Sequence, residues 1–327
     1  MSSNSSDEPA PFYNYTDPSS LAACILMLLN GLFGVLCNSL IVYIFVKEKK
    51  ERSAFNVICV VRAVVNFYVL VTNHLGLFIP MTWTGLDLFS NNLQTWAICM
   101  ANSLYMANEY LTVVIAVNRF ISLFFPLYYA RLCGMKPTIL ILVVMYAYRI
   151  GKVTQETIMY TGIGCAVRYY VDFLSWTPDF SPECESNGGL LMFMAINFGI
   201  VSIFNVATFA KIIVFYRNQQ KSDRESRKRI KKNVYLFIQT LLQDSLYLID
   251  ISFTFYFFNF YQNRLWTFFC GTFIWQSLHS FDGFIMIMFN ERLSFLKKQL
   301  FEPLTTKVSF VRPSQISTTA NSAVVVT

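Results

Sequence analysis

Long runs of apolar residues alternate with short polar segments along most of this chain. Seven of these runs are long enough to cross a bilayer, which takes about 20 apolar residues per helix. They cover residues 21–46, 55–79, 93–120, 137–165, 190–216, 234–258 and 265–289. The pattern predicts an all-α membrane protein, a bundle of seven transmembrane helices.

Basic residues gather on one side of the predicted bundle. Twenty of the 26 Lys and Arg residues lie near the ends of the first, third and fifth spans and in the C-terminal tail. The opposite loops hold only Arg168 and Arg264. Because cytoplasmic loops are enriched in Lys and Arg, this asymmetry predicts that the N-terminus lies outside the cell. Two acceptor sequences for glycosylation, at Asn4 and Asn14, fall in this predicted extracellular tail.

The composition is that of one membrane domain with two tails. Hydrophobic residues make up 55% of the chain and charged residues only 14%, whereas about 25% of a soluble domain is charged. We expect an extracellular tail at 1–20, a seven-helix domain at 21–301 and a disordered cytoplasmic tail at 302–327. The domain is predicted to end in a short amphipathic helix, because Leu293, Leu296 and Leu300 share one face.

Several classes of function are not predicted. The net charge of +7 comes from basic residues beside helices, where anionic lipid is the available counter-charge, so nucleic acid is not an expected partner. Gly-x-Ser-x-Gly and phosphate-loop motifs are absent, and the two histidines, His74 and His279, lie in separate spans. We therefore expect no enzyme activity, no cofactor and no metal site.

The eight cysteines leave two disulfide pairings open. Cys99 lies near the outer end of the third span, and Cys165 and Cys184 flank the loop after the fourth. A bridge between Cys99 and Cys184 is the main expectation, and Cys165 with Cys184 is the alternative. Cys24, Cys37, Cys59 and Cys270 are interpreted as buried apolar residues.

Polar residues inside the spans cluster at similar depth. With a rise of 1.5 Å per residue, most lie about 10 to 16 Å from the predicted cytoplasmic end of their helices. The predicted layer comprises Asn38, Arg62, Asn66, Glu109, Asp244, His279 and Asp282. Intramembrane charges are costly and often functional, so one cation is expected to meet several carboxylates, as a conformational switch, an ion site or simple polar packing.

A second group of polar and aromatic residues lies in the outer half of the spans. Its members are Asn102, Tyr105, Asp250, Thr272 and Trp275. Such side chains suit a small ligand in a mostly apolar cavity, and ordinary aromatic packing is the alternative.

The fourth span fits the pattern least well. Its apolar run is interrupted at residues 149–156, where Lys152 and Glu156 have the spacing of an i,i+4 ion pair. This polar stretch indicates either a wrongly joined sequence or a helix that has lost its membrane character.

The end of the third span carries a recognisable motif. Asn118-Arg119-Phe120, followed by Pro126-Leu127-Tyr128-Tyr129, resembles the Asp-Arg-Tyr and Pro-Leu-x-Tyr motifs of rhodopsin-like G-protein-coupled receptors. Asn38 in the first span also matches that family. Asn118 replaces the acidic residue that usually holds the motif arginine, and Asn66 and Asp282 exchange the usual positions of Asp and Asn.

Further residues resemble the nematode serpentine chemoreceptors of class X, over about residues 38–290. They are residues 53–56, 62–63, 237–240, 243–244, 249–250, 254–255, 275, 279, 282–283 and 289–290. The resemblance implies a receptor in the plasma membrane of sensory neurons or their cilia, with a small-molecule ligand, a heterotrimeric G protein and the lipid bilayer as partners. Coupling is then expected at Arg119, Pro126, Arg227, Lys228 and Arg229.

Two other functions compete with this expectation. An ion- or proton-coupled transporter would use Arg62 and the carboxylates of the polar layer as a relay. An intramembrane aspartyl protease would need Asp250 and Asp282 side by side, but the helical rise offsets them by roughly 14 Å. The sequence therefore favours a chemosensory receptor, with a transporter as the alternative.

Overall fold

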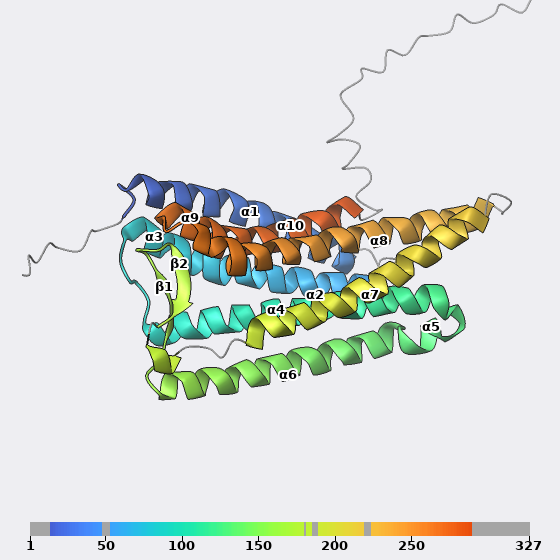
Figure 1. Cartoon of the computed structure of the whole chain (residues 1–327), viewed down its shortest axis with the longest axis horizontal. Helices are drawn as coiled ribbons and strands as arrows, with labels where there is room; N and C mark the ends of the chain where they lie inside the picture. The colour runs from blue at the N-terminus through green and yellow to red at the C-terminus, as the bar shows by residue number, and fades with distance from the viewer. Residues whose placement is uncertain (1–13, 48–52, 180, 185–188, 219–223, 290–327) are drawn as a thin grey trace, which may run out of the picture. The chain divides into compact units, whose positions relative to one another are not determined.

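A computed structural model of the chain describes residues 14–47, 53–179, 181–184, 189–218 and 224–289. The predicted spans all form helices that run side by side (Figure 1). The first four are α1 (Pro18–Lys47), α2 with η2 and α3 (Ala54–Val69, Leu70–Phe78, Ile79–Thr84), α4 (Asn91–Phe124) and α6 (Met135–Gly162). The last three are α7 (Gly189–Asn218), α8 with η5 and η6 (Arg224–Ile251, Ser252–Tyr256, Phe257–Phe260), and α9 with η7 and α10 (Arg264–Phe268, Phe269–Phe273, Ile274–Phe289). The seven-helix prediction is confirmed.

Four of these helices are long and apolar enough, by length and composition alone, to cross a membrane. They are Pro18–Lys47, Ala54–Thr84, Met135–Gly162 and Leu191–Phe215. The fourth span is among them, although its polar stretch made it the least certain on sequence. Arg149 is buried against α4, where its carbonyl accepts a 3.1 Å hydrogen bond from Ser103. Lys152 and Glu156 form the predicted i,i+4 ion pair, at 3.5 Å.

Short polar side chains begin several of the helices. The Ser53 hydroxyl accepts from the backbone N–H of Asn56 at the start of α2, and Ser90 accepts from Leu93 at the start of α4. Asp17 accepts from the Ser20 N–H at the start of α1, at 2.8 Å. Each cap satisfies a backbone donor that the first helical turn leaves without a partner.

Two glycines bring α1 and α10 into close contact. A Cβ atom at Gly283 would lie 2.7 Å from Asn38 Oδ1, and one at Gly34 would lie 2.3 Å from Ser280 Oγ. These distances are too short for a real side chain, so only glycine allows this approach. The contact places Asn38 where its Nδ2 donates to the carbonyl oxygen of His279, at 3.1 Å.

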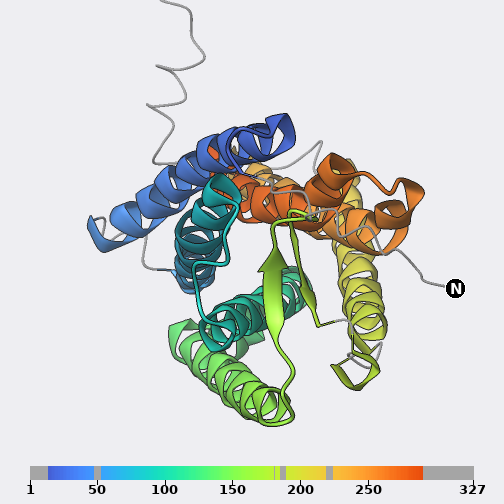
Figure 2. The ribbon, with the colours of Figure 1, turned by 90° about the vertical axis from the view of Figure 1, so that its left-hand side faces the viewer.

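A β-hairpin, absent from the sequence prediction, covers one end of the bundle. Strands β1 (Val167–Tyr170) and β2 (Ser175–Pro178) pair antiparallel, with Val167 opposite Pro178. Figure 2 looks down on this end, which we call the hairpin end, and shows the hairpin crossing between the helices. The opposite end carries the short helix α5 (Pro126–Leu132) and is called the α5 end.

The expected disulfide between Cys99 and Cys184 is wrong. The alternative pairing is confirmed: Cys184 pairs with Cys165, with the two Cα atoms 5.6 Å apart, and Cys99 is free. The reason is the hairpin: its strands return the chain to the end of α6, and the Asp179 N–H donates to the Ala166 carbonyl. Cys99 lies about two turns inside α4, away from this junction.

Three predictions fall outside the described residues. These are the glycosylation site at Asn4, the amphipathic helix ending at residue 301 and the tail at 302–327.

Candidate functional site

Asp282 on α10 is the centre of a buried polar network. Its Oδ2 accepts from Arg62 Nε at 2.9 Å and from Asn66 Nδ2 at 2.7 Å, and its Oδ1 accepts from Gln243 Nε2 at 2.8 Å. Arg62 is 1% exposed and Asp282 is fully buried. Because a buried charge needs both a counter-charge and hydrogen bonds, this arrangement ties α2, α8 and α10 together.

A second set of amides extends the network to α4 and α6. Asn66 Oδ1 accepts from Asn108 Nδ2 at 3.1 Å and lies 2.8 Å from His279 Nδ1. The Tyr146 hydroxyl donates to Asn108 Oδ1 at 3.0 Å. With Asn38 on α1 bound to the His279 carbonyl, six of the seven spans meet in this network.

Five residues of the predicted polar layer join the network, and two do not. Asp244 instead accepts from Asn205 on α7, at 2.8 Å, and the buried Glu109 Oε2 has no hydrogen-bond partner. Neither carboxylate forms an ion pair with the residues that the structure describes. The expectation that Arg62 meets several carboxylates is therefore wrong, since Asp282 is its one ion-pair partner among the described residues.

The two sets of residues separate because neighbouring side chains point in different directions from the same helix. Successive helical residues point about 100° apart, so Asn108 enters the network while its neighbour Glu109 turns toward α7. Gln243 and Asp244 on α8 divide in the same way. Depth along the helix axis cannot distinguish these neighbours. Gln243 belonged to the quoted family motif, whereas Tyr146 gave no signal among the apolar residues of its span.

The two diverging carboxylates line a crevice between α4, α7 and α8. Its enclosed volume is about 20 Å³, room for a group the size of one water molecule, and it is partly open. The lining residues are Glu109, Thr112, Asn197, Phe198, Val201, Asp244, Tyr247 and Ile251.

Among the residues predicted to line an outer ligand pocket, Thr272 and Trp275 contact the hairpin, whereas Tyr105 and Asp250 contact each other. Tyr105 donates to Asp250 Oδ2 at 2.8 Å, which joins α4 to α8. The Thr272 hydroxyl donates to the Leu174 carbonyl in the hairpin, at 2.8 Å, and the rings of Trp275 and Trp176 lie 5.4 Å apart. No described contact joins Asn102 to these residues.

His74 is a buried residue of this region that the sequence analysis did not assign. Its ring lies 5.1 Å from those of Phe78 and Trp275, and neither ring nitrogen has a hydrogen-bond partner. It lies in η2, a π-helical segment, and such segments often occur at functional sites.

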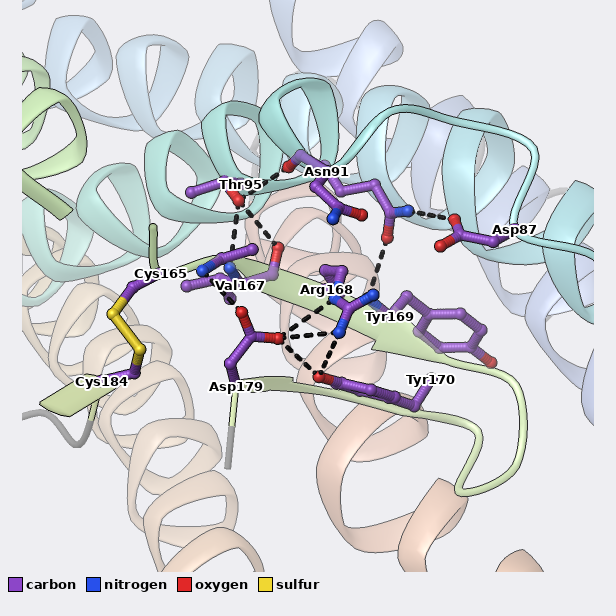
Figure 3. Close-up of polar contacts among 12 residues, drawn as sticks. Asp87, Asn91, Thr95, Cys165, Val167, Arg168, Tyr169, Tyr170, Asp179 and Cys184 are labelled. Atoms are coloured by element: carbon purple, nitrogen blue, oxygen red, sulfur yellow. Dashed lines mark hydrogen bonds and ion pairs between the residues drawn. A yellow bond between two sulfur atoms is a disulfide. The ribbon is translucent and has the colours of Figure 1, made fainter. Parts of the chain in front are cut away.

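The hairpin is held to α4 and closed on itself by polar contacts (Figure 3). The Val167 N–H donates to Thr95 Oγ1, and the Tyr169 N–H to Gln94 Oε1, each at 3.0 Å. Asp179 Oδ1 accepts from Arg168 Nη2 at 2.9 Å and from the Tyr170 hydroxyl at 2.8 Å. Burial opposes ionisation of Asp179, but these hydrogen bonds and the Arg168 charge outweigh it and lower the pKa of Asp179.

Arg119, the motif arginine, is buried near the α5 end. Its Nη1 donates to Thr240 Oγ1 on α8 at 2.5 Å, and its guanidinium lies 5.4 Å from the ring centre of Phe55. Asn118 accepts a 3.2 Å hydrogen bond from Tyr129 on α5, the helix that begins at Pro126. The predicted coupling residues Arg227, Lys228 and Arg229 lie at the start of α8, where the structure describes the backbone only.

Comparison with known families agrees with this geometry. Residues 28–290 match the family model described as serpentine type 7TM GPCR chemoreceptor Srx. No curated relative matches the chain. The matched range holds the whole polar network, the crevice, the hairpin and Arg119. This membrane protein therefore belongs to the Srx family of serpentine seven-transmembrane G-protein-coupled chemoreceptors.

Proposed function

We propose that this chemoreceptor binds a small environmental ligand within the bundle and activates a heterotrimeric G protein at its α5 end. The α5 end would lie in the cytoplasm, as the distribution of basic residues predicts, and sensory neurons or their cilia would be the site of action. The family describes chemoreceptors of the G-protein-coupled class, and the contact between Arg119 and Thr240 is the observation that carries the proposal for this chain.

That contact suits a restraint on an inactive bundle. Arg119 is 8% exposed, and two of its guanidinium nitrogens, Nε and Nη2, have no hydrogen-bond partner. Because a charged group without full hydrogen bonding is costly to bury, the arginine gains partners if α8 moves and exposes it. Release of Arg119 to a G protein would thus require the loss of one hydrogen bond, the bond to Thr240.

A ligand could bias this restraint through the aromatic and polar side chains between the two ends. Tyr105 links α4 to Asp250 on α8, and its ring lies 6.1 Å from that of His279, which reaches the network at Asn66. A ligand shifts such a bundle only by binding its two arrangements with different affinity. The Tyr105 contact is where a change between α4 and α8 would begin.

The transporter alternative receives less support from these contacts. Its relay requires Glu109 and Asp244 beside Arg62 and Asp282. Glu109 and Asp244 instead line the crevice, whereas Arg62 and Asp282 pair with each other in the polar network. An ion path through the network would have to pass the buried ion pair and its amides. The receptor proposal needs no such path.

The test replaces Arg119 while leaving the fold intact. Arg119→Ala should abolish nucleotide exchange on co-expressed G proteins in response to an odorant panel, with surface expression unchanged. Thr240→Val should raise the exchange rate without ligand, because it removes the hydrogen bond that holds the arginine. Arg131→Ala removes an exposed basic residue of α5 and is the matched control. Unchanged signalling in Arg119→Ala would refute the proposal.

A further inference from the structure

The hairpin end of the bundle offers a ligand little access from solvent. Leu174 is fully buried in the hairpin, and the Tyr169 ring stacks on Phe78 with 4.4 Å between ring centres. Gly271 lies so close to the hairpin that a Cβ atom there would meet Ser175 Oγ at 2.4 Å. Figure 2 shows the strands crossing this end from the side of α4 toward α10. The hairpin thus covers the region where an outer pocket was predicted.

The crevice between α4, α7 and α8 lies far from both ends. Glu109 is about 27 Å from the start of α4 at Asn91 and about 22 Å from its end at Phe124, from the helical rise. Phe198, on the lining, is 40% exposed. An opening at this depth, on the outer surface of a transmembrane bundle, faces lipid hydrocarbon. Molecules dissolved in the bilayer can therefore reach it directly.

Several polar groups in the crevice have no partner. Glu109 Oε2, Asn197 Nδ2 and the Tyr247 hydroxyl are buried without a hydrogen bond, and these residues are 5%, 8% and 4% exposed. Asp244 adds a second carboxylate, bound to Asn205 alone among the described hydrogen bonds. Unsatisfied buried polar groups are costly and rare in native proteins. Here they surround one space, so a bound group with hydrogen-bond donors would satisfy the oxygen atoms of Glu109 and Tyr247, whereas Asn197 Nδ2 is itself a donor and needs an acceptor.

We propose that this crevice binds a lipophilic amine that enters from the bilayer, an inference that rests on the proposed receptor function. Two carboxyl groups and a phenol make the lining rich in acceptors, and Phe198, Val201 and Ile251 supply apolar surface for an alkyl chain. An ammonium group donates up to three hydrogen bonds and carries the complementary charge. A neutral alcohol has a single donor and no charge, so it is a weaker match.

Entry from the bilayer requires no net transfer of charge. An uncompensated carboxylate in hydrocarbon is costly, so Glu109 is most stable as a neutral carboxyl group until a cation pairs with it. A neutral amine arriving through the lipid takes that proton from the carboxyl oxygen onto its nitrogen. The product is an ammonium–carboxylate pair, and the total charge of protein plus ligand is unchanged.

The experiment measures binding of n-octylamine to the full-length receptor in lipid nanodiscs, by the rise in its thermal unfolding midpoint. n-Octanol at equal membrane concentration is the uncharged control ligand. We expect a saturable rise with the amine and little with the alcohol. Glu109→Gln should weaken amine binding by about tenfold or more, since hydrogen bonds to charged groups typically contribute that much. Asp244→Asn should weaken it in the same direction.

Glu156→Gln is the matched control, because it removes an exposed carboxyl group of α6 outside the crevice. It should leave the amine affinity within about twofold of the original. That change is well below the loss of affinity expected when a hydrogen bond to a charged group is removed. Equal stabilisation by n-octanol, or unchanged affinity in both Glu109→Gln and Asp244→Asn, would overturn the site. Faster association in Cys184→Ser, which loosens the hairpin, would overturn entry from the bilayer.

The binding assay is independent of signalling. Amine binding that depends on Glu109, without any G-protein activation, would support the site and reject the proposed receptor function. Ligand-dependent activation that is unchanged in both Glu109→Gln and Asp244→Asn would support the receptor function and reject the proposed amine site.

Discussion

Arg62 Nε on α2 and Asp282 Oδ2 on α10 form an ion pair of 2.9 Å whose partners are 220 residues apart in the chain. Arg62 Nη1 and Nη2 have no hydrogen-bond partner, while the guanidinium lies 5.2 Å from the ring centre of Tyr247. The pair thus compensates the charge of Arg62 but only part of its hydrogen-bonding capacity. Removing one partner is consequently more harmful than removing both.

Asp282→Asn is predicted to lower the free energy of unfolding by about 3 to 5 kcal/mol, the usual cost of leaving a buried charge without its partner. The double variant Arg62→Met with Asp282→Asn should recover much of this loss, because the polar network around Asp282 then holds no unpaired charge. Thermal unfolding in nanodiscs measures both. A double variant that is less stable than Asp282→Asn would contradict this account of the pair.

Gly283→Ala is predicted to destabilise the bundle by about 1 to 3 kcal/mol, as overpacking usually does. The added Cβ would lie 2.7 Å from Oδ1 and 2.8 Å from Cγ of Asn38, so α1 and α10 must move apart. Gly151→Ala is the control, because a Cβ there has no atom within 4 Å. It should be neutral or stabilising by about 0.5 to 1 kcal/mol, the helix preference of Ala over Gly.

The helices themselves were predictable because a bilayer sets their length. All seven apolar runs became helices, and the i,i+4 spacing of Lys152 and Glu156 gave their ion pair. The direction in which each residue faces was not predictable in the same way. Leu29 and Leu36 on α1 are 64% and 59% exposed, and they are as apolar as residues of the core. With lipid outside, hydrophobic periodicity does not reveal the inner face of a helix.

The site was therefore found only in part. Asn38, Arg62, Asn66, His279 and Asp282 were placed correctly in one network, because a polar group inside a span must find a polar partner. Asn108 and Glu109 lie at nearly the same depth but face different helices. Depth therefore could not show that Asn108 belongs to the polar network and Glu109 to the crevice. The hairpin was missed because its two four-residue strands leave little pattern in a loop. That omission also led to the wrong disulfide.

Cys184→Ser is predicted to lower stability by about 2 to 5 kcal/mol, the typical effect of removing a native disulfide. The lost bridge closes the base of the hairpin and joins two cysteines that are 19 positions apart in the sequence. Cys99→Ser is the control and should leave the unfolding midpoint nearly unchanged, since Cys99 is free. Peptide mapping without reduction gives a direct check, and a peptide that joins Cys99 to Cys184 would contradict the observed pairing.

Asp179 predicts an acid-sensitive hairpin. Its pKa in the folded protein lies below the ordinary 3.8, so the folded state favours its ionised form. This contribution is complete above the unfolded pKa and disappears as the pH falls through the folded pKa. Asp179→Asn should thus be less stable than the original receptor near neutral pH, and the difference should shrink as the pH falls below 3.8 and through the lowered pKa of Asp179. Hydrogen exchange at the backbone amides of the hairpin measures this difference in stability.

Asp17 contributes with the same sign, because its pKa is also lowered: burial opposes ionisation, but the Ser20 N–H and the Arg264 charge outweigh it. The comparison between Asp179→Asn and the original chain cancels this shared effect. A stability difference that is independent of pH would show that Asp179 acts through its shape rather than its charge.

The distance along the chain between Arg62 and Asp282 also matters during biosynthesis. The second helix enters the membrane early, whereas Asp282 leaves the ribosome only with the last one, so every growing chain passes through a stage with a bare guanidinium among lipids. A truncated chain never leaves that stage. The finished receptor thereby differs from every chain that stops before residue 282 by one neutralised charge.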